Sequence, residues 1–182
     1  MNDITGENVK TADKMNEELL IQTFEIYYDK IYSFFFYHIH NHEQAQDLAG
    51  EVFCRIAAAW STYDPKKAAV STWVFSIAKN LLRDVWRKRK LVEVELLDIA
   101  VSIDLDAGPE RMEQSRLICH ALRCLTARER ELIALKVIGD LKTAEIASLT
   151  NLSPNHIRVT LFRALKKLRS KLEDNEVCRG GR

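Results

Sequence analysis

The spacing of apolar residues constrains this chain most, because it repeats every three or four positions through most of the sequence. The first such stripe comprises Leu20, Phe24, Tyr27, Ile31 and Phe35. Residues spaced in this way lie on one face of an α-helix. No stretch alternates apolar and polar residues strictly enough for a β-strand. We therefore predict an all-α fold.

Two further stripes complete the first half of the chain. The second comprises Ala45, Leu48, Ala49, Val52, Phe53, Ile56 and Trp60, and the third comprises Val70, Val74, Ile77, Ala78, Leu81 and Val85. Cys54 falls inside the second stripe and is predicted to be a small core residue. Ser61–Lys67 separates the two helices and contains Asp64-Pro65, a loop signal. These patterns predict a three-helix domain over residues 17–90, after an N-terminal extension of residues 1–16.

The second half is also helical, but it follows a break. Residues 91–109 are acidic, lack clear periodicity and end in Ala107-Gly108-Pro109, which predicts a flexible linker. Helices are then expected over about 110–125, 127–138, 143–149 and 154–172. Thr126 and Glu129 form a capping-box pattern at the start of the second of these, and Gly139 follows its end. We predict a second small helical domain over 110–172 and a frayed tail over 173–182.

The charges are segregated although their sum is only +1. Residues 79–90 carry six bases and one acid, and residues 153–172 carry six bases and no acid. Residues 91–114, between them, carry seven acids and one base. Two basic blocks in one chain indicate two surfaces that face a polyanion. The alternative is two solvated helix faces without a ligand.

Residues 144–167 carry a helix-turn-helix pattern. Ala147 is small where two helices must approach closely, and Asn151 tolerates the left-handed backbone that the turn requires. Ser153 can cap the second helix, and Pro154 suits its first position. The pattern predicts a short helix, a turn and a longer recognition helix.

The recognition helix is expected to separate an apolar face from a polar one. Its inward residues are predicted to be Ile157, Leu161, Leu165 and Leu168. The residues predicted to face DNA are Ser153, Asn155, His156, Arg158, Thr160, Arg163, Lys166 and Lys167. The N-terminal members suit base edges, and the later basic members suit phosphates. An ordinary charged surface helix is the alternative.

The third helix of the first half is the second candidate for a nucleic-acid surface. Its polar face offers Thr72, Trp73, Ser76, Lys79, Asn80, Arg83 and Arg87. Trp73, Phe75 and Trp86 are interleaved with these bases, and such aromatic rings can stack on unpaired nucleotides. The alternative places the aromatic rings in the core.

Several classes of protein are disfavoured by the sequence. No run of 18 apolar residues occurs, and residues 1–14 lack the pattern of a secretion signal, so we expect a cytoplasmic chain without membrane insertion. No phosphate-binding loop, nucleophile elbow or zinc-enzyme motif is present, so we expect neither catalysis nor a cofactor. Cys54, Cys119, Cys124 and Cys178 form no CxxC pair, and His38, His40 and His42 lack partners at metal-ligand spacing, so no metal site is expected.

Two blocks of the sequence resemble a known family. The residues 47–53 (DLAGEVF), 63–65 (YDP), 72–73 (TW) and 77–80 (IAKN) resemble region two of bacterial RNA polymerase sigma factors. The residues 125–131 (LTARERE), together with the helix-turn-helix, resemble sigma region four. Only these two regions, joined by a short linker, are present. That layout is typical of the extracytoplasmic-function sigma factors, which form group four.

The resemblance implies a role for each part of the chain. Asp47, Glu51 and Phe53 would bind core polymerase. The loop from Tyr63 to Ser71 and the helix after it would melt and read the minus-ten promoter element. The residues expected there are Tyr63, Lys66, Lys67, Ser71, Trp73, Phe75, Lys79, Asn80, Arg83 and Arg87. Region four would read the minus-thirty-five element, and an inhibitory anti-sigma factor would be a further partner.

Two other functions are compatible with parts of the sequence. A stand-alone helix-turn-helix regulator would share the C-terminal half, but it would need a sensor domain that the first half does not show. A metal- or redox-responsive helical protein would use the histidine and cysteine residues. A sequence-specific complex with duplex DNA in the absence of polymerase would favour the first, and stoichiometric bound metal would favour the second.

Overall fold

The computed structural model describes residues 4–91, 122 and 124–177. Within those residues it contains helices and no strand, which confirms the all-α prediction. The α-helices are α1 (Ile4–Ile39), α2 (His42–Ala59), α3 (Val70–Leu91), α5 (Ala127–Ile133), α6 (Thr143–Thr150) and α7 (Pro154–Val177). A 3-10 turn, η1 (Trp60–Thr62), follows α2, and a π-helical turn, η2 (Ala134–Ile138), extends α5. The linker and the helix predicted over 91–125 lie almost entirely outside the described residues.

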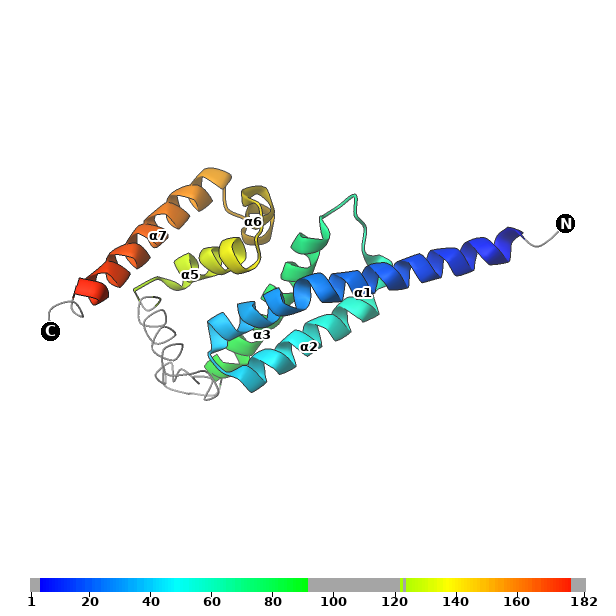
Figure 1. The fold of residues 1–182 in the computed structure, drawn as a ribbon, viewed down its shortest axis with the longest axis horizontal. Helices are drawn as coiled ribbons and strands as arrows, with labels where there is room; N and C mark the ends of the chain where they lie inside the picture. The colour runs from blue at the N-terminus through cyan, green and yellow to red at the C-terminus, as the bar shows by residue number, and fades with distance from the viewer. Residues whose placement is uncertain (1–3, 92–121, 123, 178–182) are drawn as a thin grey trace.

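The helices gather into two groups (Figure 1). Helices α1, α2 and α3 lie side by side, and α5, α6 and α7 form a second, shorter group against α3 and the end of α1. Helix α1 extends well beyond α2 toward the N-terminus. It begins at Ile4, so the predicted N-terminal extension is continuous with the first helix. No helix in the described part of the chain is long and apolar enough to cross a membrane.

The first group is built on the predicted stripes. Ile31 and Phe35 of α1 are fully buried, as are Val52 and Ile56 of α2. His40 has a φ of 55° at the sharp turn between the two helices. Asn41 then caps α2, because its Oδ1 accepts the backbone N–H of Gln44 at 2.9 Å. These contacts hold α2 antiparallel against α1 and leave its opposite face exposed.

The helix-turn-helix predicted in the second group is confirmed in its local details. Thr126 and Glu129 form the capping box that opens α5. Asn151 ends α6 with a φ of 55°, the left-handed conformation that the turn requires. The hydroxyl of Ser153 accepts the backbone N–H of His156 at 3.2 Å and so caps α7.

Three predicted core or boundary positions are wrong. Cys54 is exposed, because the buried face of α2 passes through Val52, Phe53 and Ile56 instead. Leu165 is 51% exposed, because the apolar face of α7 follows Ile157, Leu161, Ala164 and Leu168, at steps of three and four. The C-terminal fraying predicted from residue 173 is also wrong up to Val177, since α7 continues to that residue.

Gly139 plays a different role from the predicted one. It has a φ of −71°, and the neighbouring Asp140 takes the left-handed conformation at 53°. A Cβ atom added at Gly139 would lie 2.7 Å from the carbonyl oxygen of Leu135 and 3.0 Å from the ring of Phe75 on α3. Glycine is needed here because a side chain would crowd both the backbone of its own turn and the Phe75 ring of the other group, not for an unusual backbone.

A pair of glycine substitutions tests this packing. Gly50→Ala places a methyl group inside α2 where nothing lies within 4 Å, so it should stabilise the protein by about 0.5–1 kcal/mol through helix propensity. Gly139→Ala should destabilise it by about 1–3 kcal/mol, because the methyl group would crowd the Leu135 carbonyl oxygen and the Phe75 ring. Urea unfolding of both variants measures the difference. Equal stabilities would contradict the close approach at Gly139.

The two groups share one continuous hydrophobic core. Phe34 and Phe75 from the first group belong to the same buried cluster as Leu135, Leu141 and Ile146 from the second. A smaller cluster around Leu122, Leu125, Ile133 and Ala164 lies within the second group, and Tyr37 of α1 packs against it. The predicted two helical units are therefore present, but they are packed against each other.

Candidate nucleic-acid interface

The predicted minus-ten residues on α3 divide between two faces of the helix. Ser71, Phe75 and Lys79 point toward the second group of helices, and Asn80, Arg83 and Arg87 lie on an exposed face. The division follows from helical geometry, because positions 71, 72, 75 and 79 lie toward one side of the helix and positions 76, 80, 83 and 87 toward another. The sequence predicted one surface, whereas the structure has two.

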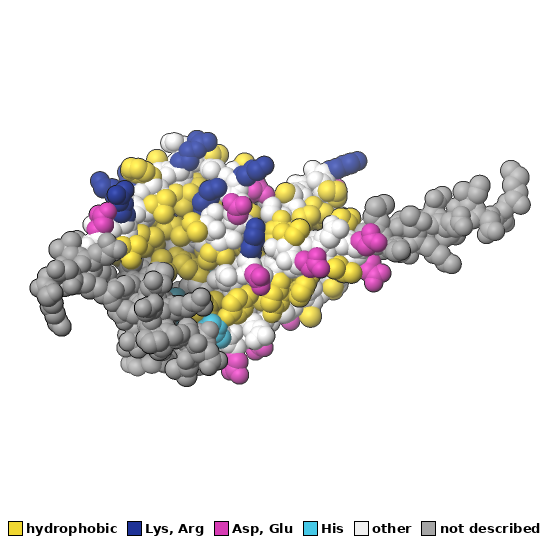
Figure 2. Space-filling view, viewed as in Figure 1, with side chains coloured by type: hydrophobic (Ala, Val, Ile, Leu, Met, Phe, Trp, Pro, Cys, Tyr) yellow, Lys and Arg dark blue, Asp and Glu magenta, His cyan; other side chains and the backbone are white. Residues whose placement is uncertain are grey.

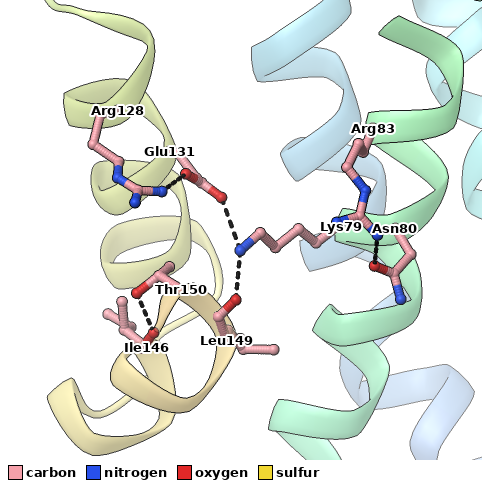
Figure 3. Close-up of polar contacts among 8 residues, drawn as sticks. All are labelled: Lys79, Asn80, Arg83, Arg128, Glu131, Ile146, Leu149 and Thr150. Atoms are coloured by element: carbon pink, nitrogen blue, oxygen red, sulfur yellow. Dashed lines mark hydrogen bonds and ion pairs between the residues drawn. The ribbon is translucent and has the colours of Figure 1, made fainter. Parts of the chain in front are cut away.

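The covered face of α3 is held by polar contacts with α5 and α6. The Glu145 carboxylate accepts the hydroxyl groups of Ser71 at 2.5 Å and Thr72 at 3.2 Å. The Lys79 ammonium donates to the Leu149 carbonyl at 2.5 Å and lies 3.1 Å from the Glu131 carboxylate, as Figure 3 shows. The Lys79 and Glu131 side chains are only 24% and 20% exposed. We call this set of contacts the α3–α6 interface.

Glu145 is held as a charged carboxylate in this interface. Burial alone would raise its pKa, but hydrogen bonds from Ser71, from the backbone N–H of Lys142 and from Thr72 hold the pKa below its usual value. The Lys142 N–H lies 2.7 Å from the second oxygen of the same carboxylate. Glu145 therefore both caps α6 and binds α3.

The prediction that Phe75 faces DNA is wrong for this arrangement. Its side chain is fully buried, packed edge-on against Phe34 of α1 with ring centroids 5.6 Å apart. The Phe75 ring is buried because it fills the space beside Gly139, where no side chain is present. Phe75 contributes packing and is not available to stack on a base.

The exposed face of α3 presents an organised set of donors. Arg83 donates to the side-chain oxygen of Asn80 at 2.8 Å, and Arg87 lies 3.2 Å from Asp84. All three predicted DNA-facing residues, Asn80, Arg83 and Arg87, are exposed. Exposed ion pairs of this kind contribute little to stability, so these side chains are free to exchange partners.

The loop between α2 and α3 is anchored by an aromatic cluster. The ring of Trp73 lies 5.0 Å from that of Tyr63 and 5.9 Å from that of Trp60. The Tyr63 hydroxyl donates to the Ala68 carbonyl at 3.0 Å, which closes the loop. Lys66 and Lys67 lie exposed on it. The sequence pattern places Trp60 only in the apolar stripe of α2, and the structure adds its contact with the rings of Tyr63 and Trp73.

Helix α7 presents a basic outer surface. The exposed members of the predicted set are Ser153, Asn155, His156, Arg158, Arg163, Lys166 and Lys167, and Thr160 is half-buried. Figure 2 shows Lys and Arg side chains gathered over this part of the molecule, whereas acidic side chains lie mainly along α1 and α2. Arg163 and Lys166 also line an open cavity of about 580 Å³ beside Cys124. The surface has the charge and helical geometry that a DNA groove accepts.

Lys167 is tied to the body of its domain. Its ammonium lies 2.7 Å from the carboxylate of Glu129, which also caps α5. The hydrogen bond from Lys167 and those from Thr126 hold the pKa of Glu129 below its usual value. Lys167 therefore orients α7 against α5, a role that its sequence position did not predict.

The outer face of α2 carries the residues predicted to bind polymerase. Asp47 and Glu51 are exposed one turn apart, and Glu51 pairs with Arg55 at 2.8 Å. Phe53 is only 8% exposed and packs against Phe24 of α1 with ring centroids 4.9 Å apart. The ring of Phe53 thus lies in the α1–α2 contact, whereas Asp47 and Glu51 face outward, and the predicted contact of Phe53 with polymerase stays a prediction.

The histidine residues around the turn between α1 and α2 are held by aromatic neighbours. His38 packs between Phe34 and Trp86, and His42 contacts Phe36 and hydrogen-bonds Tyr32. Burial, with smaller effects of Arg130 and His40, lowers the pKa of His38 to about 3. Across the described residues, no group of three His, Cys, Asp or Glu side chains is placed to hold a metal ion.

Comparison with known protein families identifies the family of this chain. Residues 23–92 match the family model for sigma-70 region 2, and residues 115–168 match that for sigma-70 region 4. The chain belongs to the extracytoplasmic-function sigma factors. It is therefore a transcription initiation factor, which binds RNA polymerase and directs initiation at promoters.

Curated relatives resemble this sigma factor along nearly their whole length. SigX of Bacillus subtilis (strain 168), an extracytoplasmic-function sigma factor, is 28% identical over 86% of this chain and 85% of the relative. SigW of the same organism is 28% identical over 91% of this chain and 95% of its own. The similarity to these relatives thus extends over most of both chains.

Solved structures share the fold. The sigma factor RpoE of Bartonella quintana, solved with the anti-sigma factor NepR, superposes with a TM-score of 0.67 at 19% identity, over 84% of this chain and 95% of that one. CnrH, solved with the cytosolic domain of CnrY, gives a TM-score of 0.61 at 21% identity, over 89% and 90% of the two chains. These likenesses establish the helical architecture of both regions.

Proposed function

We propose that this sigma factor divides promoter recognition between its two helical domains, residues 17–90 and 110–172. The exposed face of α2, with Asp47 and Glu51, binds core polymerase. The loop over residues 63–69 and the polar face of α3 melt and read the minus-ten element. Helix α7 reads the minus-thirty-five element through Asn155, His156 and Arg158, while Arg163 and Lys166 bind phosphates. The chain contributes no catalytic group, and it acts in the cytoplasm with the polymerase.

The geometry of the helix-turn-helix carries this proposal. The left-handed Asn151 and the Ser153 cap direct the N-terminal end of α7 outward, and every side chain proposed to contact bases there is exposed. Residues at the start of a recognition helix usually meet base edges in the major groove.

Each DNA-reading surface alone offers few contacts. Core polymerase holds both at a fixed separation, so that the second contact becomes effectively intramolecular and the combined affinity rises by orders of magnitude. Melting is favoured because unpaired bases gain stacking and pocket contacts that duplex DNA does not offer. RpoE of Bartonella quintana was solved in complex with the anti-sigma factor NepR, which supports an anti-sigma factor as a further partner of this chain.

Run-off transcription with purified bacterial core polymerase and a library of promoters tests the proposed function. Addition of the chain should create new start sites, and their yield should fall steeply with salt, with a log–log slope of about 0.9 per neutralised phosphate. A chain that neither associates with core polymerase nor redirects initiation would overturn the proposal. A sequence-specific duplex complex formed without polymerase would support the stand-alone regulator instead.

A further inference from the structure

Two apolar side chains lie exposed on the recognition helix α7. Val159 is 40% exposed, and the ring of Phe162 is 70% exposed. Neither belongs to the hydrophobic clusters of the described residues, because α7 packs against the rest of the protein through its other face, where Ile157 and Ala164 are fully buried. The packing of the fold therefore does not account for either side chain.

The two side chains lie among the polar residues that are proposed to contact DNA. Positions 155, 159, 162 and 166 follow one another at steps of four, three and four, so they form one line along the helix. All four residues on this line are exposed. Val159 and Phe162 thus lie between the proposed base contact Asn155 and the proposed phosphate contact Lys166. The predicted DNA-facing set omits them because it contains only polar residues.

The pair falls within the length of helix that a major groove can accept. An α-helix rises about 1.5 Å per residue, so residues 155–162 extend over about 10 Å. The major groove of B-DNA is about 12 Å wide. Val159 and Phe162 are separated by about 4.5 Å along the helix axis, which is close to the spacing of about 3.4 Å between neighbouring base pairs. Both side chains can therefore reach the same base pair or adjacent ones.

The charge around the pair indicates which kind of surface covers it. Residues 153–172 carry six bases and no acid, so this face of α7 favours a partner that is strongly anionic and yet offers an apolar group. Among the groups that base pairs present in the major groove, the 5-methyl group of thymine is the apolar one. Phenylalanine is one of the side chains that contact this methyl group in protein–DNA interfaces.

From these observations we infer that Val159 and Phe162 are specificity-determining residues, which contact the 5-methyl groups of thymines in the minus-thirty-five element. This inference rests on the proposed function of α7 and extends it. The polar residues Asn155 and Arg158 read hydrogen-bonding groups on base edges, whereas the apolar pair selects thymine by its methyl group. At the base pairs that the pair contacts, thymine is required on a defined strand.

Replacement of thymine by uracil tests this contact, because uracil lacks only the 5-methyl group and pairs with adenine in the same way. The probe is a duplex promoter selected in the run-off library, in which each thymine of the minus-thirty-five element is replaced in turn. Thymine and uracil templates that give transcripts of different length compete for holoenzyme formed from the full chain and bacterial core polymerase. The ratio of the two transcripts is the measured quantity, and it does not depend on how much holoenzyme a variant forms.

The variant to be compared with the wild type is Val159→Ala with Phe162→Ala. Both side chains are exposed, so their truncation should leave the fold intact. The matched control is Leu172→Ala, which removes an apolar side chain that is 39% exposed on the same helix but lies off the line of positions 155, 159, 162 and 166.

The wild type should prefer the thymine template about four-fold at one or more positions, because burial of an aliphatic carbon contributes about 0.8 kcal/mol. The double variant should bring this ratio close to one at those positions, whereas Leu172→Ala should keep the wild-type ratio. A wild-type ratio near one at every thymine would overturn the inference. So would a double variant that retains the wild-type ratio.

Failure of the proposed function gives a different result. If promoter choice responds to Arg158→Ala while uracil and thymine templates are transcribed equally, only the contact with the methyl groups is wrong. If promoter choice responds neither to Arg158→Ala nor to uracil, α7 does not read the minus-thirty-five element at all. Weaker binding of the double variant to core polymerase, together with equal transcription of both templates by the wild type, would assign the pair to a protein interface instead.

Discussion

Replacing Asp47 and Glu51 together by lysine should reduce the affinity for core polymerase by more than about 100-fold. Loss of a charge pair at an interface typically costs about 2–5 kcal/mol, and about 2.8 kcal/mol corresponds to that factor. Both side chains are exposed on α2, and the buried residues Ala49, Val52 and Ile56 lie on its other face. Only the surface should change, so the fold should be retained. Fluorescence anisotropy with labelled chain and unlabelled core measures the affinity.

The control for this variant carries the same change of charge on another helix. Glu18→Lys with Glu25→Lys alters two exposed residues of α1 and should leave the polymerase affinity near the wild-type value. Thermal unfolding should be similar for both doubly substituted proteins. Wild-type affinity in the Asp47 and Glu51 variant would show that polymerase docks elsewhere on the chain.

Substitution of Arg158 and Arg163 should impair promoter choice while leaving polymerase binding intact. Arg158→Ala should weaken the binding free energy for the preferred promoter by about 1–3 kcal/mol, because a contact with a base edge is lost. The loss on other promoters should be much smaller. Arg163→Ala should weaken binding to all promoters nearly uniformly, because a phosphate contact is lost. The log–log slope of transcript yield against salt concentration should fall by about 1. Both guanidinium groups are exposed on α7, so stability should change little. Run-off yields over the promoter library at several salt concentrations separate the two effects.

Arg169→Ala is the internal control on the same helix. Arg169 is exposed and is held by Glu173 at 2.8 Å, one turn further along α7. Its removal should change the salt slope less than removal of Arg163. If Arg158→Ala weakens every promoter to the same extent, then Arg158 does not read base edges.

The local structure of this protein could be read from its sequence, because short-range rules govern it. The capping box at Thr126, the left-handed Asn151 and the cap at Ser153 each depend on residues within four positions of one another. The same holds for the helical stripes, which depend on a period of 3.6 residues. These features set the framework of the helix-turn-helix.

Predictions that depended on distant contacts were less successful. The sequence pattern predicts that the ring of Phe75 stacks on DNA bases. In the structure the ring is buried against Phe34 of α1 and Gly139 at the end of η2. The sequence pattern predicts that Lys79 binds a phosphate, but in the structure its ammonium pairs with the carboxylate of Glu131, more than fifty residues away in sequence. No periodicity in a sequence encodes how one helical domain packs on another. Glu131 and Glu145 were for this reason absent from the predicted site.

The link between Glu129 and Lys167 bears on how new promoter preferences can be engineered. The Glu129 carboxylate caps the N-terminus of α5 and also accepts a hydrogen bond from Lys167 in the middle of α7. The outward-facing residues at the beginning of α7 take no part in this contact. The orientation of α7 therefore does not depend on the side chains that are proposed to contact the DNA bases. Libraries randomised at positions 155, 156 and 158 should consequently yield folded proteins with altered DNA preferences, provided that this anchor is left in place.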